Sequence, residues 1–222
     1  MATILVVAPH PDDETLGCGG TLLKHAGHGD QVYWLIMTKM SPVVGYSAEQ
    51  ISIREEEIKK VVEAYHFEKV FPLQYATTML DTVPRRELMA AVSKVVKEVQ
   101  PTTIYLPNRS DIHSDHRVTF ETVMGAIKTF RAPSVKRVLA YEVLSETEFA
   151  PSLPTEAFMP NSFSDISDYL EKKIEIMHLY EGELGTHPFP RSAENIRALA
   201  TLRGATAGVQ YAEAFTVLKE IV

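Results

Sequence analysis

The chain has 222 residues, of which 45% are hydrophobic, and its formal net charge is −7 at pH 7. This length and apolar content suffice for one substantial core, and no apolar run is long enough to span a membrane. The negative charge argues against nucleic acid or an anionic membrane as the main partner. A single cysteine excludes an intrachain disulfide. Because no signal-peptide pattern opens the chain, we expect a cytoplasmic protein.

Strand-like and helix-like patterns alternate along the first two thirds of the chain. Short, apolar, β-branched runs predict strands over residues 3–7, 31–38, 70–73, 103–106 and 135–143. Apolar residues at helical spacing predict helices from about residue 21 to 28 and over 48–65, 84–100 and 118–127. This alternation is typical of the α/β class. It predicts a single Rossmann-like domain built on a mainly parallel, doubly wound sheet.

The rest of the chain is less regular. A loop through Pro160 is expected to lead to helices over 167–180 and 192–207 and then to a strand over 214–218. We find no repeat, linker or second domain, so residues 1–222 are expected to form one domain.

Gly17, Gly19 and Gly20 follow the first strand but do not form a nucleotide-binding loop. Neither Gly-x-Gly-x-x-Gly nor the Gly-Lys-Ser/Thr phosphate loop is present. We expect these glycines to let a helix pack closely on the sheet. Cys18, which lies among them, is expected to be a small buried residue rather than a metal ligand.

A metal-binding pattern directly follows the first strand. His10, Asp12 and Asp13 come after the apolar run, at the strand end where ligands bind in open α/β sheets. Imidazole and carboxylate are good Zn²⁺ ligands, and a nearby carboxylate that does not bind the metal can serve as a general base. The alternative is a polar turn in which Asp13 or Glu14 caps the following helix.

A second polar cluster, Asp111-Ile112-His113-Ser114-Asp115-His116, follows the strand expected at 103–106. It could instead be a solvated loop with Ser114 or Asp115 as a helix N-cap. Two such clusters after two strands favour one shared metal site. Catalytic zinc usually takes three protein ligands, whereas the clusters offer six candidates: His10, Asp12, Asp13, His113, Asp115 and His116.

The two clusters resemble the signature motifs of the PIG-L/LmbE-like family, metal-dependent deacetylases of N-acetylglucosaminyl compounds. The first motif is present as His10-Pro11-Asp12-Asp13-Glu14, with Pro9 where the family has alanine. The second is present as His113-Ser114-Asp115-His116. Shorter similarities extend over nearly the whole chain, at Gly45-Tyr46-Ser47, Arg54-Glu55-Glu56, Arg191-Ser192, Arg203-Gly204 and Tyr211-Ala212-Glu213-Ala214-Phe215.

The resemblance assigns a role to each motif residue. It implies a metal held by His10, Asp13 and His116. Asp12 is then the general base and His113 stabilises the oxyanion, to which a protonated imidazole could supply positive charge. Asp115 is expected to accept a proton from an imidazole and so fix its tautomer. The implied reaction removes the N-acetyl group of an N-acetylglucosamine-type sugar or sugar conjugate and releases acetate.

The resemblance also implies a cofactor and partners. The expected metal is Zn²⁺, with Fe²⁺ as an alternative because two histidines and one carboxylate also suit non-haem iron. The expected partner is an N-acetylated sugar or glycoconjugate, and family members commonly self-associate, so a homo-oligomer is expected. Two rival functions are a non-haem iron enzyme and a non-catalytic carbohydrate-binding protein stabilised by its metal.

Three residues are predicted to bind substrate. Arg54 lies on the apolar stripe of the helix at 48–65, so its guanidinium faces inward and needs a partner. Glu14 ends the first motif, and Asp81 lies in the loop at 76–82. This loop and the one at 39–46 follow strand ends and should border the site.

Three further features have open roles. Arg203 lies on a similar stripe but near a helix end, where we expect it to anchor structure. His187 and the Ser145-Glu146-Thr147 segment could touch substrate, although ordinary loops and turns also favour such residues.

Overall fold

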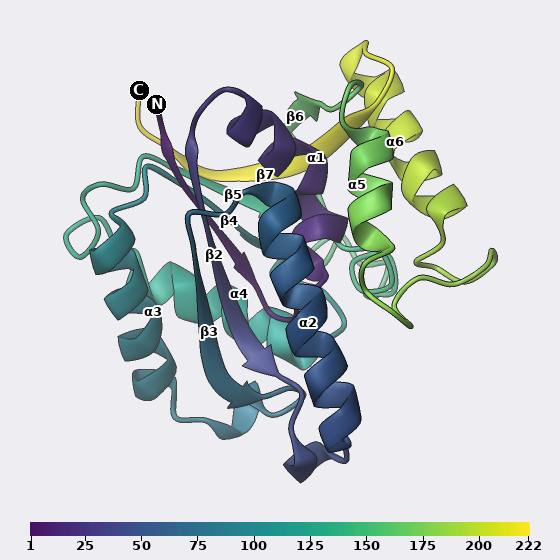
Figure 1. Ribbon diagram of the computed structural model, residues 1–222. Coiled ribbons are helices and arrows are strands. Elements are labelled where there is room, and N and C mark those ends of the chain that lie inside the picture. Colours follow the sequence, from purple (N-terminus) through teal and green to yellow (C-terminus); the bar gives the residue numbers. More distant parts are fainter.

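A seven-stranded sheet runs through the centre of the molecule in the order β3-β2-β1-β4-β5-β7-β6 (Figure 1). The structure is a computed structural model that describes residues 1–222. Five neighbouring strands are parallel: β1 (Thr3–Ala8), β2 (Gln31–Lys39), β3 (Lys69–Ala76), β4 (Thr103–Pro107) and β5 (Arg137–Tyr141). The antiparallel strand β7 (Ala212–Glu220) pairs with β5 and with β6 (Ser162–Asp165). The predicted fold class, a single α/β domain with a mainly parallel sheet, is confirmed.

Helices cover both faces of the sheet (Figure 1). One face carries α1 (Asp13–Gly27), α2 (Ala48–Tyr65), α5 (Leu170–Met177) and α6 (Ala193–Ala207). The other carries α3 (Arg85–Val99) and α4 (Ser114–Ala126). Side chains of β1 alternate between the two apolar clusters, with Val6 in one and Leu5 and Val7 in the other, as the two-residue period of a strand requires. Burial on both sides explains why β1 reads as an unbroken apolar run.

The strand order brings the two polar motifs together. β1 and β4 are neighbours in the sheet, but α1 after β1 covers one face and α4 after β4 covers the other. The two connections therefore diverge, which leaves a crevice at the carboxyl ends of these strands.

Helix α1 begins at Asp13, well before the expected start near residue 21. The glycine-rich segment is part of this helix, and it packs too closely on its neighbours to carry side chains: a Cβ on Gly17 would lie 2.2 Å from the ring of Tyr141. A Cβ on Gly20 would lie 2.7 Å from Ile166. Cys18 is buried, and the helix kinks at this residue, where φ is −147°.

A buried ion pair supports the kink. The Glu213 carboxylate accepts the backbone N–H groups of Gly20 and Thr21 at 2.9 and 2.8 Å, just after the kink. The Lys173 ammonium donates to this carboxylate at 2.7 Å and to the carbonyl of Leu16, just before the kink, at 2.9 Å. The two charged groups thus bind the backbone N–H and C=O groups that the break in the helix leaves without helical partners.

Other boundaries differ by smaller amounts. Helix α4 begins at Ser114 rather than 118, because His113 caps it by accepting the backbone N–H of Asp115. Strand β6 falls in a region expected to be loop; its sequence is short and polar, and it is held at the sheet edge by pairing with β7. Short 3₁₀ helices, η1 (Pro42–Val44) and η2 (Leu80–Thr82), occupy the two loops expected to border the site. No helix is long and apolar enough to cross a membrane.

Candidate metal centre and active site

The connection from β1 to α1 supplies three of the candidate side chains. His10 and Asp12 lie in this short turn, and Asp13 is the first residue of α1. Asp12 has φ 129° and ψ −31°, a conformation that costs a residue with a side chain about 1–3 kcal/mol. It occupies the N-cap position, yet its carboxylate makes no capping hydrogen bond and instead lines a cavity.

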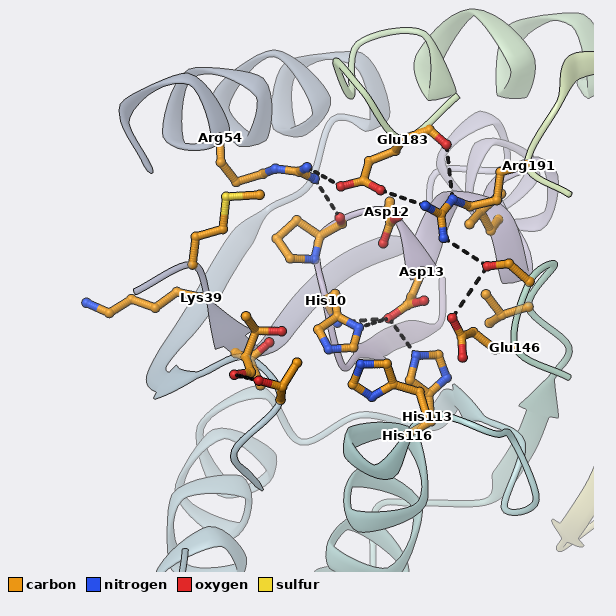
Figure 2. Close-up of a pocket in the computed structure, with 18 of the residues that line it drawn as sticks. His10, Asp12, Asp13, Lys39, Arg54, His113, His116, Glu146, Glu183 and Arg191 are labelled. Carbon is orange, nitrogen blue, oxygen red and sulfur yellow. Dashed lines mark hydrogen bonds and ion pairs between the residues drawn. The ribbon is translucent and has the colours of Figure 1, made fainter. Parts of the chain in front are cut away.

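Three ligand atoms converge at this turn (Figure 2). The Asp13 Oδ2 atom lies 3.3 Å from His10 Nδ1 and 3.3 Å from His116 Nε2. Potential ligand atoms of the three residues all lie within 4.8 Å of one another. His116 Nε2 is buried without a hydrogen-bond partner. Two imidazoles and one carboxylate fit a divalent metal such as Zn²⁺, and the unpartnered nitrogen of the His116 imidazole is free to bind it.

Each histidine of this set has a carboxylate behind it. His10 Nε2 lies 3.0 Å from Asp115 Oδ2, and His116 Nδ1 lies 2.9 Å from Asp111 Oδ2. The hydroxyl of Thr147 donates to the other Asp111 oxygen at 2.7 Å. Such partners orient metal-binding imidazoles and direct the opposite ring nitrogen toward the metal.

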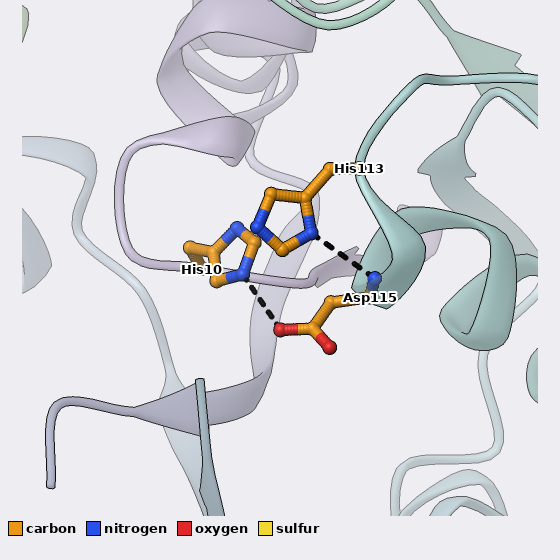
Figure 3. Close-up of side chains that lie close together, drawn as sticks. All are labelled: His10, His113 and Asp115. Atoms are coloured by element: carbon orange, nitrogen blue, oxygen red, sulfur yellow. Dashed lines mark hydrogen bonds and ion pairs between the residues drawn. The ribbon is translucent and has the colours of Figure 1, made fainter. Parts of the chain in front are cut away.

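A second possible ligand set, His10, His113 and Asp115, is less suited to a metal (Figure 3). The Asp115 carboxylate already accepts the backbone N–H groups of Thr78 and Leu80 at 2.6 and 3.1 Å. His113 Nδ1 accepts the Asp115 backbone N–H at 3.1 Å. Asp13 Oδ2 of the first set also accepts a backbone N–H, that of His10 at 2.8 Å, so it is the buried, unpartnered His116 Nε2 atom that favours the first set.

The histidine cluster favours a positive charge at its centre. Burial disfavours the imidazolium form of His10, but hydrogen bonds to Asp115 and Asp13 raise the pKa of His10 to about 9. A metal that binds here must displace this proton, and the carboxylates that favour the proton also favour the cation.

The pKa values of the two remaining catalytic candidates, Asp12 and His113, shift in opposite directions. Burial and the adjacent Asp13 carboxylate raise the pKa of Asp12 well above its usual range. Burial and the nearby imidazole of His10 lower the pKa of His113 to about 4. Because His113 Nδ1 accepts a backbone N–H, the proton of the neutral ring lies on Nε2. This lowered pKa favours a neutral His113 that donates through Nε2, whereas the sequence suggested a protonated imidazole; the role of His113 stays a prediction.

The cluster of candidate ligands opens into a cavity of about 250 Å³ with a polar lining. On one side a salt-bridge network crosses its wall: Glu183 accepts from both Arg54 and Arg191, and Arg191 also donates to the Ser145 hydroxyl at 2.9 Å. Arg54 pairs further with Glu57 at 3.0 Å. The predicted need of Arg54 for a buried partner is met by these two glutamates.

The structure does not bring every candidate into the cavity. Glu14 is fully buried beneath it and accepts from the Tyr180 hydroxyl at 2.7 Å, whereas Asp81 is exposed in η2. Neither lines the cavity, so a direct role in substrate binding is not supported for either. Arg203 pairs with Glu142 away from the metal cluster, and His187 is exposed outside the cavity.

Sequence reasoning overlooked several residues of the site. Asp111 opens the second motif and directly follows the β4 strand region, so its position was a usable signal. Glu183 and Arg191 lie in the loop between α5 and α6. Arg191 belongs to one of the shorter family similarities but was given no role, and no local pattern indicates that either residue reaches the β1 motif. Lys39 and Tyr46, which also line the cavity, belong to the loop segment that was expected to border it.

We expect Asp111→Asn to weaken metal binding by about 10- to 100-fold, because the amide cannot hold His116 Nδ1 as the carboxylate does. Thr147→Val leaves the Asp111–His116 hydrogen bond in place and should weaken binding less; it removes the hydroxyl that donates to Asp111 and accepts the Val143 backbone N–H. Competition with a chromophoric chelator measures both affinities. Equal affinities in Asp111→Asn and the unmodified protein would show that Asp111 does not support the metal ligand.

The fold and the cluster together define the class of protein: an α/β protein with a candidate metal site at the switch point of its sheet. Residues 5–127, more than half of the chain, match the model of the PIG-L family, described as GlcNAc-PI de-N-acetylase. The chain belongs to this family.

Similar proteins extend the match beyond this region. Diacetylchitobiose deacetylase of Thermococcus kodakarensis is 26% identical over 217 residues, covering 95% of this chain and 80% of that protein. A probable N-acetyl-alpha-D-glucosaminyl L-malate deacetylase 2 of Bacillus anthracis is 27% identical over 192 residues, covering 82% of each. The crystal structure of a conserved protein from Thermus thermophilus has the same fold, with a TM-score of 0.79 at 24% identity, and covers 100% of this chain and 97% of that one.

Proposed function

We propose that this protein hydrolyses the N-acetyl amide of an N-acetylglucosamine-type sugar or sugar conjugate and releases acetate. One observation carries the proposal. Potential ligand atoms of His10, Asp13 and His116 converge, and the carboxylate of Asp12, which is not part of this set, lines the same cavity. Membership of the PIG-L family and the two deacetylases named above support this reaction class.

In this proposal Zn²⁺ is held by His10, Asp13 and His116. A divalent metal there supplies Lewis-acid polarisation and lowers the pKa of water. Asp12 accepts the proton of the attacking water as the amide carbon becomes tetrahedral, and it returns this proton to the sugar nitrogen as the C–N bond breaks and acetate forms. His113 donates a hydrogen bond from its Nε2–H group to the developing oxyanion, because its Nδ1 atom is occupied by the Asp115 backbone N–H. Asp115 in turn orients His10.

The sugar is proposed to lie in the polar cavity next to the metal. Charged and hydroxyl groups on its wall can bind hydroxyl groups of a sugar ring: Lys39, Tyr46, Arg54, Ser145, Glu146, Glu183 and Arg191. Dense polar lining of this kind suits a hydroxyl-rich ligand better than an apolar one.

Acetate release tests the proposal directly. The protein, stripped of metal and reloaded with Zn²⁺ or Fe²⁺, is incubated with N-acetylglucosamine, N,N′-diacetylchitobiose and N-acetylglucosaminyl malate. We expect acetate from at least one substrate with metal and none after chelation. Oxygen-dependent turnover without acetate would favour the iron enzyme, and tight sugar binding without turnover would favour the carbohydrate-binding protein.

We also propose that the protein self-associates, on its family membership alone. Light scattering should then give a particle mass above that of one 24.8 kDa chain. A mass equal to one chain would refute this proposal without bearing on the reaction.

A further inference from the structure

The peptide bond between Pro11 and Asp12 is held from both ends by buried side chains, a guanidinium on one side and a carboxyl group on the other. Arg54 donates to the Pro11 carbonyl oxygen at 2.9 Å, and Glu14 Oε2 accepts the Asp12 backbone N–H at 3.1 Å. Arg54 is 6% exposed and Glu14 is fully buried. The Arg54 cation thus meets the negative end of the peptide dipole, and a carboxyl oxygen of Glu14 accepts the N–H at its positive end.

Holding this peptide controls the backbone of Asp12. The angle φ of Asp12, 129°, is the rotation about its N–Cα bond. Helix α1, which begins at the next residue, fixes the Cα side of this bond, and Arg54 and Glu14 fix the peptide on its nitrogen side. A conformation this unusual for a residue with a side chain persists only where its surroundings over-determine it. Its result is a carboxylate that lines the cavity instead of capping the helix.

The two holding side chains are themselves anchored. Glu14 Oε1 accepts from the hydroxyls of Tyr180 and Thr15 at 2.7 and 2.6 Å. Arg54 lies over the Tyr180 ring, 5.3 Å from its centroid, and is paired with Glu57. Tyr180 therefore contacts both of them, so Glu14, Arg54 and Tyr180 form one packed unit that reaches from beneath the cavity to its wall.

We propose that Glu14 and Arg54 are positioning residues that hold the general base Asp12 through the Pro11–Asp12 peptide. This inference rests on the proposed function, in which Asp12 is the base. It assigns to Glu14 a role that does not require contact with substrate, in agreement with its place beneath the cavity.

Two substitutions at Glu14 separate this role from a general structural one. Glu14→Met keeps the unbranched shape but removes both acceptor oxygens, and it should lower kcat by roughly 10- to 100-fold through misplacement of the base, with unchanged KM and one metal per chain. Glu14→Gln keeps an oxygen for the Asp12 N–H, while its amide can donate to the Tyr180 oxygen, and should restore most of the lost kcat.

A double-mutant cycle tests whether Glu14 acts through Asp12. In an Asp12→Asn background, Glu14→Met should cause no further loss of kcat, because no base is left to misplace. The same loss in both backgrounds, or a Glu14→Met enzyme with normal kcat, would overturn the proposal. So would a Glu14→Gln enzyme as impaired as Glu14→Met, since the negative charge would then be what matters.

Crystal structures provide a readout that needs no turnover. Asp12 should keep a positive φ in the unmodified protein and lose it in Glu14→Met. An unchanged φ in the variant would refute the positioning role of Glu14. Should Glu14→Met not fold, Arg54→Lys tests the opposite end with the same readout, because lysine lacks the fork that reaches Pro11 and Glu183 together. Absence of acetate release by the unmodified protein would refute the proposed function. The φ of Asp12 in the variants would still show whether Glu14 and Arg54 hold the Pro11–Asp12 peptide.

Discussion

Asp12→Asn is expected to lower kcat for acetate release by about 10²- to 10⁴-fold, the range typical for loss of a general base. Asparagine keeps the shape of the side chain but cannot accept the proton of the attacking water. Because Asp12 is not one of the three proposed ligands, the variant should still bind one metal per chain. Kinetics of acetate release, together with metal analysis of the same preparation, measure both quantities.

Asp81→Asn is the matched control for this substitution. It makes the same chemical change at a carboxylate that the sequence suggested for substrate binding but that lies exposed outside the cavity. Its kcat and KM should equal those of the unmodified enzyme. A loss of activity in Asp12→Asn that is accompanied by loss of metal would assign Asp12 to the metal site and contradict its role as base.

Lys173→Met is expected to lower the free energy of unfolding by about 3 kcal/mol, because it leaves the buried Glu213 carboxylate without its cation. This value is at the lower end of the usual range since Glu213 keeps three donors, two backbone N–H groups and the Thr21 hydroxyl. Glu213→Met should cost about 5 kcal/mol, because it strands the ammonium and also uncaps α1 after its kink. Urea unfolding at one fixed protein concentration measures both changes.

The double variant Lys173→Met/Glu213→Met should lose less stability than the sum of the two single changes, because neither charge is then left unpaired. Lys172→Met is the matched control: Lys172 directly precedes Lys173 in the same helix, is exposed and is paired only with Glu175. It should change stability by less than about 0.5 kcal/mol. Additive losses in the double variant would show that the two residues act independently.

The parallel core of the fold and the two polar motifs could be predicted from the amino-acid sequence, because both are local properties. The unbroken apolar runs of β1 and β4 require burial on two faces, and polar residues that directly follow such strands must lie at their carboxyl ends. The family resemblance, which rested on these motifs, is confirmed by the family match over residues 5–127. The individual roles of His10, Asp12 and His113 stay predictions for the experiments above.

Which of the remaining candidates reach the site depends on how the elements pack. Glu14 is one residue away from Asp13 in the sequence, yet the turn into α1 directs it beneath the cavity, where Tyr180 holds it. Glu183 lies far from Arg54 in the chain and meets it only because α5 and α2 cover the same face. Local patterns record which way a strand or helix faces, but they contain nothing about which distant side chain will satisfy a buried charge. That choice, here Glu183 for Arg54 and Asp111 for His116, is made when the elements come together.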